Sequence, residues 1–167
     1  MRNFKYMTIA LILLFSMKLK SEVKIGQKPP PFRLFAGEKI IDLTNYLGAI
    51  PIVISFFSTT CRPCKREIPF LHKKSHNNTK FKLILVVTDT GNEGKIKKFL
   101  KSIHKKFENI PYIYDPYGKI LKDYNDPKKL PYTIYIGKSG KVVSIQTGYS
   151  YKKKYLLKKI IKLLQEK

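Results

Sequence analysis

Apolar residues recur along this chain in two patterns, short runs typical of β-strands and longer stretches with helical spacing. Two runs, 52–57 and 81–87, are almost continuously apolar, as expected of strands buried on both faces of a sheet. Shorter β-type runs occupy 32–35, 38–43, 110–114, 132–136 and 141–147. Turn-forming residues at 36–37 and 137–140 predict that the first two and the last two of these shorter runs form β-hairpins.

Helical spacing predicts three main helices, over 63–74, 94–106 and 151–164, and a short helix over 120–124. The last main helix carries lysines opposite its apolar residues, and we expect it to pack on the sheet rather than to lie on a membrane. The alternation of strands and helices predicts an α/β fold. Its central mixed sheet would be flanked by helices on both faces, with an N-terminal β-hairpin extension.

The first 21 residues have the organisation of an export signal. Arg2 and Lys5 precede an apolar run over 7–17, which is shorter than the roughly 20 residues of a membrane-spanning helix. We expect a signal peptide cleaved after Ser21 or a retained N-terminal membrane anchor over 1–21, followed by one domain over 22–167. The predicted location is extracytoplasmic, in a periplasm or on the outer face of the cytoplasmic membrane. The alternative is a buried N-terminal element of a cytosolic protein.

The formal net charge of the chain is +23. Nearly all of the 34 basic residues are lysines spread along the whole sequence, whereas proteins that read bases and phosphates favour arginine forks. We therefore expect no nucleic-acid partner. Peripheral contact with an anionic membrane or with acidic partners explains the net positive charge better.

The only two cysteines, Cys61 and Cys64, lie between the predicted strand 52–57 and the predicted helix 63–74. The start of a helix favours a thiolate, and the second thiol, one turn further along, is within reach of a disulfide. A closed zinc site would need four ligands, and the chain has neither a second C-x-x-C nor a histidine pattern that supplies them. A purely structural disulfide would close a very short loop and constrain the unfolded chain little. Redox chemistry is therefore the favoured interpretation.

Glu67 lies three positions after Cys64 and shares a face of the predicted helix with it. A carboxylate there can accept or return the proton of the inner thiol, which must ionise to complete an exchange reaction. The alternative is a surface glutamate that the positive end of the helix dipole favours.

Four stretches carry a family resemblance: F-F-S-T-T-C-R-P-C-K-R-E-I-P-F at 56–70, V-V-T-D-T at 86–90, D-P-Y-G-K at 115–119 followed by L-P-Y-T-I-Y-I at 130–136, and G-K-S-G-K-V-V at 137–143. Together they resemble the thioredoxin superfamily and, more closely, its ResA/TlpA-like exported thiol–disulfide oxidoreductases. The resemblance covers roughly residues 26–165. It implies a thioredoxin fold in which Cys61 attacks, Cys64 resolves and Glu67 assists Cys64.

The resemblance also implies a place for substrate. Pro131 stands where such proteins keep a cis-proline, which would pack against the disulfide, and the backbone of Leu130 would pair with the substrate chain. Arg62 and Pro63, between the cysteines, complete the expected substrate contacts. Many thioredoxins bury an acid six positions before the first cysteine, where this chain has Ser55.

Two residues depart from the pattern of the family and bear on the direction of electron flow. Thr60 replaces the tryptophan that commonly precedes the first cysteine, and Arg62 brings a positive charge between the cysteines. A nearby cation favours the Cys61 thiolate and so stabilises the reduced form of the cysteine pair. This shifts the reduction potential of the pair towards that of an oxidant. We expect a reductase of exported proteins, of the cytochrome c maturation type, with a disulfide-forming oxidant as the alternative.

The expected partners are the thiols and disulfides of exported proteins and a membrane thiol carrier that supplies electrons; a monomer without cofactor or metal is expected. A peroxiredoxin-type peroxidase is disfavoured because Ile54 stands where the nucleophile motif of those enzymes needs proline. A copper-handling module on the same fold is disfavoured because His104 lies in a predicted helix, away from Leu130 and Pro131.

Overall fold

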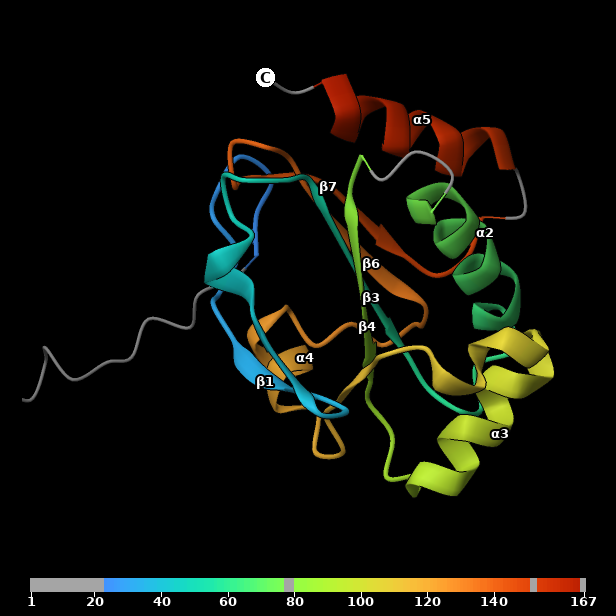
Figure 1. Ribbon diagram of the computed structural model, residues 1–167. Coiled ribbons are helices and arrows are strands. Elements are labelled where there is room, and N and C mark those ends of the chain that lie inside the picture. Colours follow the sequence, from blue (N-terminus) through green and yellow to red (C-terminus); the bar gives the residue numbers. More distant parts are fainter. Residues whose placement is uncertain (1–22, 77–79, 151–152, 166–167) are drawn as a thin grey trace, which may run out of the picture.

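The computed structural model describes residues 23–76, 80–150 and 153–165. A five-stranded mixed sheet forms its centre, in the order β5-β4-β3-β6-β7 (Figure 1). The neighbours β3–β4 and β4–β5 run parallel, whereas β3–β6 and β6–β7 run antiparallel. A separate antiparallel hairpin, β1–β2, precedes the sheet. The predicted α/β fold, with its mixed sheet and N-terminal hairpin, is confirmed.

The elements follow the predicted order closely. The strands are β1 (Arg33–Ala36), β2 (Lys39–Asp42), β3 (Ile52–Phe57), β4 (Lys82–Val87), β5 (Ile113–Tyr114), β6 (Tyr132–Ile136) and β7 (Val142–Thr147). The helices are α2 (Cys64–His76), α3 (Glu93–Ile103), α4 (Lys119–Asp123) and α5 (Lys153–Gln165), with short 3-10 helices η1 (Leu43–Asn45) and η2 (Lys105–Asn109). The expected start of the last helix at Tyr151 and the leader at 1–21 lie outside the described residues.

The two faces of the sheet are covered unequally. Helices α2, α3 and α5 lie on one face, and the β1–β2 hairpin with the short α4 lies on the other (Figure 1). Alternate residues of each central strand enter different cores, so Ile54 and Phe56 face the hairpin side while Val53 and Phe57 face the three helices. Every residue of β3 is buried, as its almost continuous apolar run predicts.

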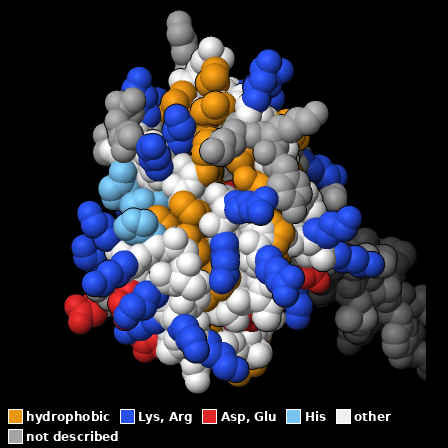
Figure 2. Space-filling view, turned by 90° about the vertical axis from the view of Figure 1, so that its right-hand side faces the viewer, with side chains coloured by type: hydrophobic (Ala, Val, Ile, Leu, Met, Phe, Trp, Pro, Cys, Tyr) orange, Lys and Arg blue, Asp and Glu red, His pale blue; other side chains and the backbone are white. Residues whose placement is uncertain are grey.

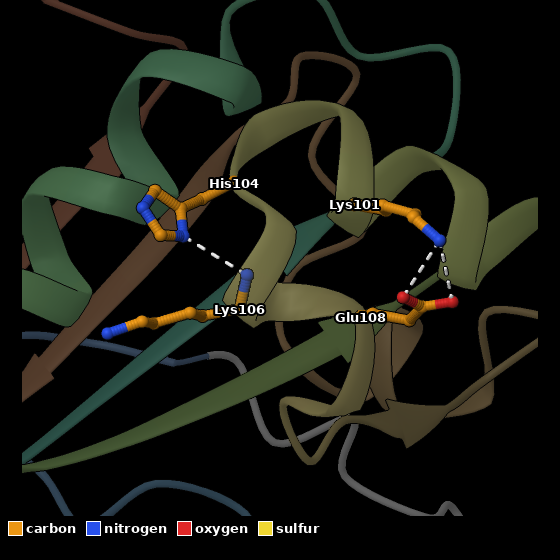
Figure 3. A network of polar contacts seen from close by, with 4 residues as sticks. All are labelled: Lys101, His104, Lys106 and Glu108. Carbon is orange, nitrogen blue, oxygen red and sulfur yellow. Dashed lines mark hydrogen bonds and ion pairs between the residues drawn. The ribbon is translucent and has the colours of Figure 1, made fainter.

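The prediction that the helix over 94–106 continues to residue 106 is wrong. Helix α3 ends at Ile103, and His104 is extended, with φ −161°. The ring Nδ1 of His104 then accepts the backbone N–H of Lys106 at 3.1 Å and caps η2 (Figure 3). Lys101 and Glu108 form an ion pair that joins α3 to η2. Phe107, within η2, is buried in the same apolar cluster as Phe99 and Leu100 of α3.

Candidate active site around the Cys61–Cys64 disulfide

Cys61 and Cys64 form a disulfide, with their Cα atoms 5.4 Å apart. Strand β3 ends at Phe57, a short turn follows, and α2 begins at Cys64, so the pair sits at the N-terminus of this helix. Solvent reaches 7% of the Cys61 surface, whereas Cys64 is fully buried. The backbone N–H of Cys64 points to the Cys61 sulfur at 3.2 Å. A thiolate on Cys61 would thus face an unpaired helix N–H group and the positive end of the helix dipole.

Asp89 fixes the turn that delivers Cys61. Its carboxylate accepts hydrogen bonds from the backbone N–H and the hydroxyl of Thr59, and its other oxygen accepts the backbone N–H of Gly91 at 3.1 Å. The turn after β3 is therefore tied to the turn after β4. Because parallel strands bring their carboxyl ends to the same edge of a sheet, this contact follows directly from the topology.

Glu67 is fully buried on α2, one turn after Cys64. The hydroxyl of Thr133, on β6, donates to one carboxylate oxygen, and the amide of Gln146, on β7, donates to the other at 2.7 Å. The interpretation of Glu67 as a surface residue is wrong, because neighbouring strands seal it into the core. Ser55, on β3, is paired with Thr133 on the adjacent strand β6, and their hydroxyl oxygens lie 3.4 Å apart.

Burial raises the pKa of Glu67 from 4.5 to about 7. The two hydrogen bonds from Thr133 and Gln146 and the positive charge of Lys159 oppose this rise. The carboxyl group therefore exchanges its proton near neutral pH, which is the condition for efficient acid–base catalysis there.

The Leu130–Pro131 peptide bond is cis. Leu130 packs against the apolar cluster that contains both cysteines, and Pro131 is buried. The carbonyl of Pro131 accepts the N–H of Gly148 at 2.8 Å, whereas the backbone of Leu130 makes no hydrogen bond within the described residues. The structure thus brings Leu130 to the cysteines with its backbone groups open.

The surface beside Cys61 is cationic. Arg62 and Lys65 are exposed, and Pro63 is half-buried between the cysteines. A hollow of about 280 Å³ lies next to Lys65, lined also by Thr59, Lys95, Lys98, Phe99 and Ser102. The helical face of the molecule carries many lysines and arginines and few acidic side chains (Figure 2).

Sequence reasoning missed Thr133, Gln146 and Asp89. Thr133 and Gln146 are polar residues at buried positions of β6 and β7, and a polar residue there signals a buried partner. That partner is Glu67, and only the packing of α2 on β6 and β7 reveals it. Asp89 follows a buried strand within V-V-T-D-T, but the sequence does not say that it reaches Thr59.

Two further findings concern the described part of the chain. It contains no group of three or more histidine, cysteine or acidic side chains arranged to hold a metal ion. Within the same residues, every helix is too short or too polar to cross a membrane.

A C-x-x-C disulfide at a helix N-terminus, a neighbouring cis-proline and this mixed sheet define a thioredoxin-like protein. The profile of the AhpC/TSA family matches residues 25–145, and the chain belongs to this family. The thiol-disulfide oxidoreductase ResA of Bacillus subtilis is 31% identical over 132 residues, which cover 77% of this chain and 70% of ResA.

Solved structures share the fold. A protein of Chlorobium tepidum classed as a thiol:disulfide interchange protein DsbE aligns with a TM-score of 0.73 at 23% identity, covering 85% of this chain and 99% of the other. StoA of Bacillus subtilis aligns with a TM-score of 0.61 at 21% identity, covering 79% and 97%. The relatives and the cysteine pair together identify the chain as a thiol–disulfide oxidoreductase of the ResA type.

Proposed function

We propose that this protein is an extracytoplasmic reductase of disulfides in exported proteins. The observation that carries the proposal is the combination at one site of a slightly exposed Cys61, a buried Cys64 and a buried Glu67 on the same helix. The similarity to ResA and the signal-like pattern of the first 21 residues support the location.

The reaction begins with Cys61 as a thiolate. It attacks one sulfur of a client disulfide, a bond forms between the two sulfurs, and the second client sulfur leaves as a thiolate. Cys64 then gives its proton to the Glu67 carboxylate and attacks Cys61. The Cys61–Cys64 bond forms, and the first client sulfur leaves with the electron pair. The client pair gains two electrons, the enzyme pair loses two, and the client thiolates take their protons from solvent.

Glu67 suits this second step for two reasons. It lies on the same helical face as Cys64, one turn away, so the inner thiol and the carboxyl group are held by one rigid element. Its pKa of about 7 means that a large fraction of the molecules carry the carboxylate at neutral pH, ready to take the proton.

Client binding is assigned to the residues around Cys61. The open backbone of Leu130 would form hydrogen bonds with an extended client segment, beside cis-Pro131. Arg62 and Pro63 would contact the same segment from the other side of the cysteines, since Arg62 is exposed there.

The partners follow from this role. Electrons would come from a membrane thiol carrier that reduces the Cys61–Cys64 disulfide after each turnover. The domain would also touch an anionic membrane. Helix α5 exposes Ile161 and Leu164, with 50% and 37% of their surface accessible, next to the exposed Lys158 and Lys162. A monomer would suffice for the reaction.

The direction of electron flow is tested by the reduction potential of the pair, measured against glutathione and dithiothreitol buffers. A potential near or below about −270 mV, the value of thioredoxin, supports the reductase. A potential near −120 mV, where strongly oxidising enzymes lie, would contradict it and favour a disulfide-forming oxidant. Arg62 is the residue that favours the second outcome, because its charge stabilises the Cys61 thiolate.

A peroxidase remains the weaker assignment despite the family match. Ile54, at the position where the peroxidase motif needs proline, lies in the interior of β3 and pairs with Ile84 and Ile134 on its two sides. Turnover of peroxide by the wild-type chain with cycling of Cys61, at a rate exceeding its exchange with protein disulfides, would reverse this ranking.

A further inference from the structure

A line of polar side chains crosses the helical face of the sheet behind the disulfide. We call it the polar seam; its members are Ser55, Glu67, Thr133, Tyr135, Ser144, Gln146 and Lys159. The strand register aligns Thr133 with Gln146 and Tyr135 with Ser144, so four members stand side by side on β6 and β7. All but Lys159 are buried. The seam therefore links the cysteine-bearing helix α2 to helix α5.

Lys159 holds the α5 end of the seam in a defined place. Its ammonium group donates to the hydroxyl of Ser144 at 2.7 Å and to the carbonyl of Ile145 at 2.8 Å. It also lies over the ring of Tyr135, 5.7 Å from the ring centre. Two short hydrogen bonds and a ring contact fix this charge, which most surface lysines leave mobile in solvent. Its position lowers the pKa of Glu67.

Gln146 holds the Glu67 carboxylate directly. Its amide nitrogen donates to Glu67 at 2.7 Å and to the carbonyl of Gly148 at 3.1 Å. Its amide oxygen is buried and has no partner within the described residues, and neither has the hydroxyl of Tyr135. The amide thus uses its donors and leaves its acceptor unsatisfied, an arrangement that serves an ionised carboxylate better than a neutral acid.

We propose that Lys159 and Gln146 are positioning residues of the exchange reaction, which favour the ionised form of Glu67 and so keep it ready to accept the Cys64 proton. This inference rests on the proposed function for its role in exchange. The charged and titratable groups that face Glu67 are Cys64 from its own helix, Tyr135 from β6 and Lys159 from α5. Burial raises the pKa of Tyr135 far above its ordinary value, so Tyr135 stays neutral and Lys159 is the charged group that acts on Glu67.

The first test observes Glu67 itself. The side-chain carboxyl carbons of ¹³C-labelled glutamates are titrated by NMR in the oxidised full chain, and Glu67→Gln assigns the signal. Lys159→Met should move the Glu67 inflection upwards by about half a pH unit or more. Lys158→Met is the matched control, because it removes the same charge from an exposed neighbour on α5. Lys159→Arg should return the inflection to the wild-type value.

Gln146 is tested in the same titration with Gln146→Met, which keeps the length of the side chain and removes its donors. The inflection should again rise, because the carboxylate loses a hydrogen bond that favours it. Equal inflections in Lys159→Met and Lys158→Met would overturn the role of Lys159. An unchanged inflection in Gln146→Met would overturn that of Gln146. A thermal melt of each variant confirms that it is folded.

The second test links the titration to the reaction. The rate of exchange with a protein disulfide is measured against pH, and its inflection should move in Lys159→Met as the NMR inflection does and stay in place in Lys158→Met. Absence of exchange in the wild type would overturn the proposed function while the titration still tests the contacts to Glu67. Normal exchange with an unmoved inflection in Lys159→Met would overturn this inference alone.

Discussion

Gln146 donates a 2.7 Å hydrogen bond to Glu67, although 79 residues separate them in the sequence. The bond joins the helix that carries the disulfide to the strand at the edge of the sheet. It places an acid with a pKa of about 7 behind Cys64, in a core from which water is excluded. The candidate chemistry of the site therefore depends on packing between distant elements as much as on the cysteine motif.

Replacing Glu67 should change how stability depends on pH. The folded protein raises the Glu67 pKa from 4.5 to about 7, so between these values the unfolded chain binds fewer protons at this position. Wild-type stability therefore falls as pH rises through this window, by up to about 3 kcal/mol from this group. Glu67→Gln should lose that fall and be more stable than the wild type at pH 8, while the two match more closely at pH 4.

The measurement is urea unfolding of both proteins, in the oxidised state, from pH 4 to pH 8. Glu93→Gln is the control, because Glu93 is exposed and pairs with Lys97 on the surface. A stability difference between wild type and Glu67→Gln that is constant over this range would show that Glu67 does not titrate in it.

Two buried tyrosines should respond in opposite ways to loss of their hydroxyl groups. The Tyr124 hydroxyl donates to the carbonyl of Pro30 at 2.7 Å, whereas the Tyr135 hydroxyl is buried without a partner among the described residues. Tyr124→Phe should cost about 1 kcal/mol of unfolding free energy, and Tyr135→Phe should be neutral or stabilising by a similar amount. Denaturant unfolding of both variants measures this, and a larger loss in Tyr135→Phe than in Tyr124→Phe contradicts it.

Arg62 should tune the potential of the pair. Arg62→Glu places a negative charge beside Cys61, disfavours the thiolate and so destabilises the reduced form. The reduction potential should become more negative by about 10–30 mV. Lys73→Glu makes a similar change of charge near the other end of α2 and should leave the potential close to wild type. Equal shifts in both variants would mean that net charge, rather than the position of Arg62, sets the potential.

The sequence predicted most of the fold because its strand segments are short apolar runs, whereas its helical segments repeat apolar residues at helical spacing. The run 52–57 is apolar except for Ser55 and matches β3 residue for residue. The boundary at His104 was not predictable, because the apolar spacing continues past Ile103 while the ring of His104 caps a new turn. The His104 ring caps the backbone N–H of Lys106, two positions later, and such a local contact does not alter the periodic pattern of apolar residues.

The candidate site was predicted where it is local and missed where it is distant. Cys61, Cys64 and Glu67 lie within one strand–turn–helix unit, so spacing alone brings them together. Glu67 was identified, but its burial depends on Gln146, which reaches it only when β7 joins the sheet. Contacts of this kind join elements that are far apart in the sequence. They depend on which strands and helices become neighbours, and only the folded structure shows that.

The central claim is that Cys61 attacks client disulfides and Cys64 resolves the product. The most direct measurement is mass spectrometry of Cys64→Ser and Cys61→Ser after incubation, as reduced proteins, with a disulfide-containing protein. Cys64→Ser should accumulate a mixed disulfide through Cys61, and Cys61→Ser should form none, because Cys64 is fully buried. A mixed disulfide through Cys64 in Cys61→Ser, with none in Cys64→Ser, would contradict the account.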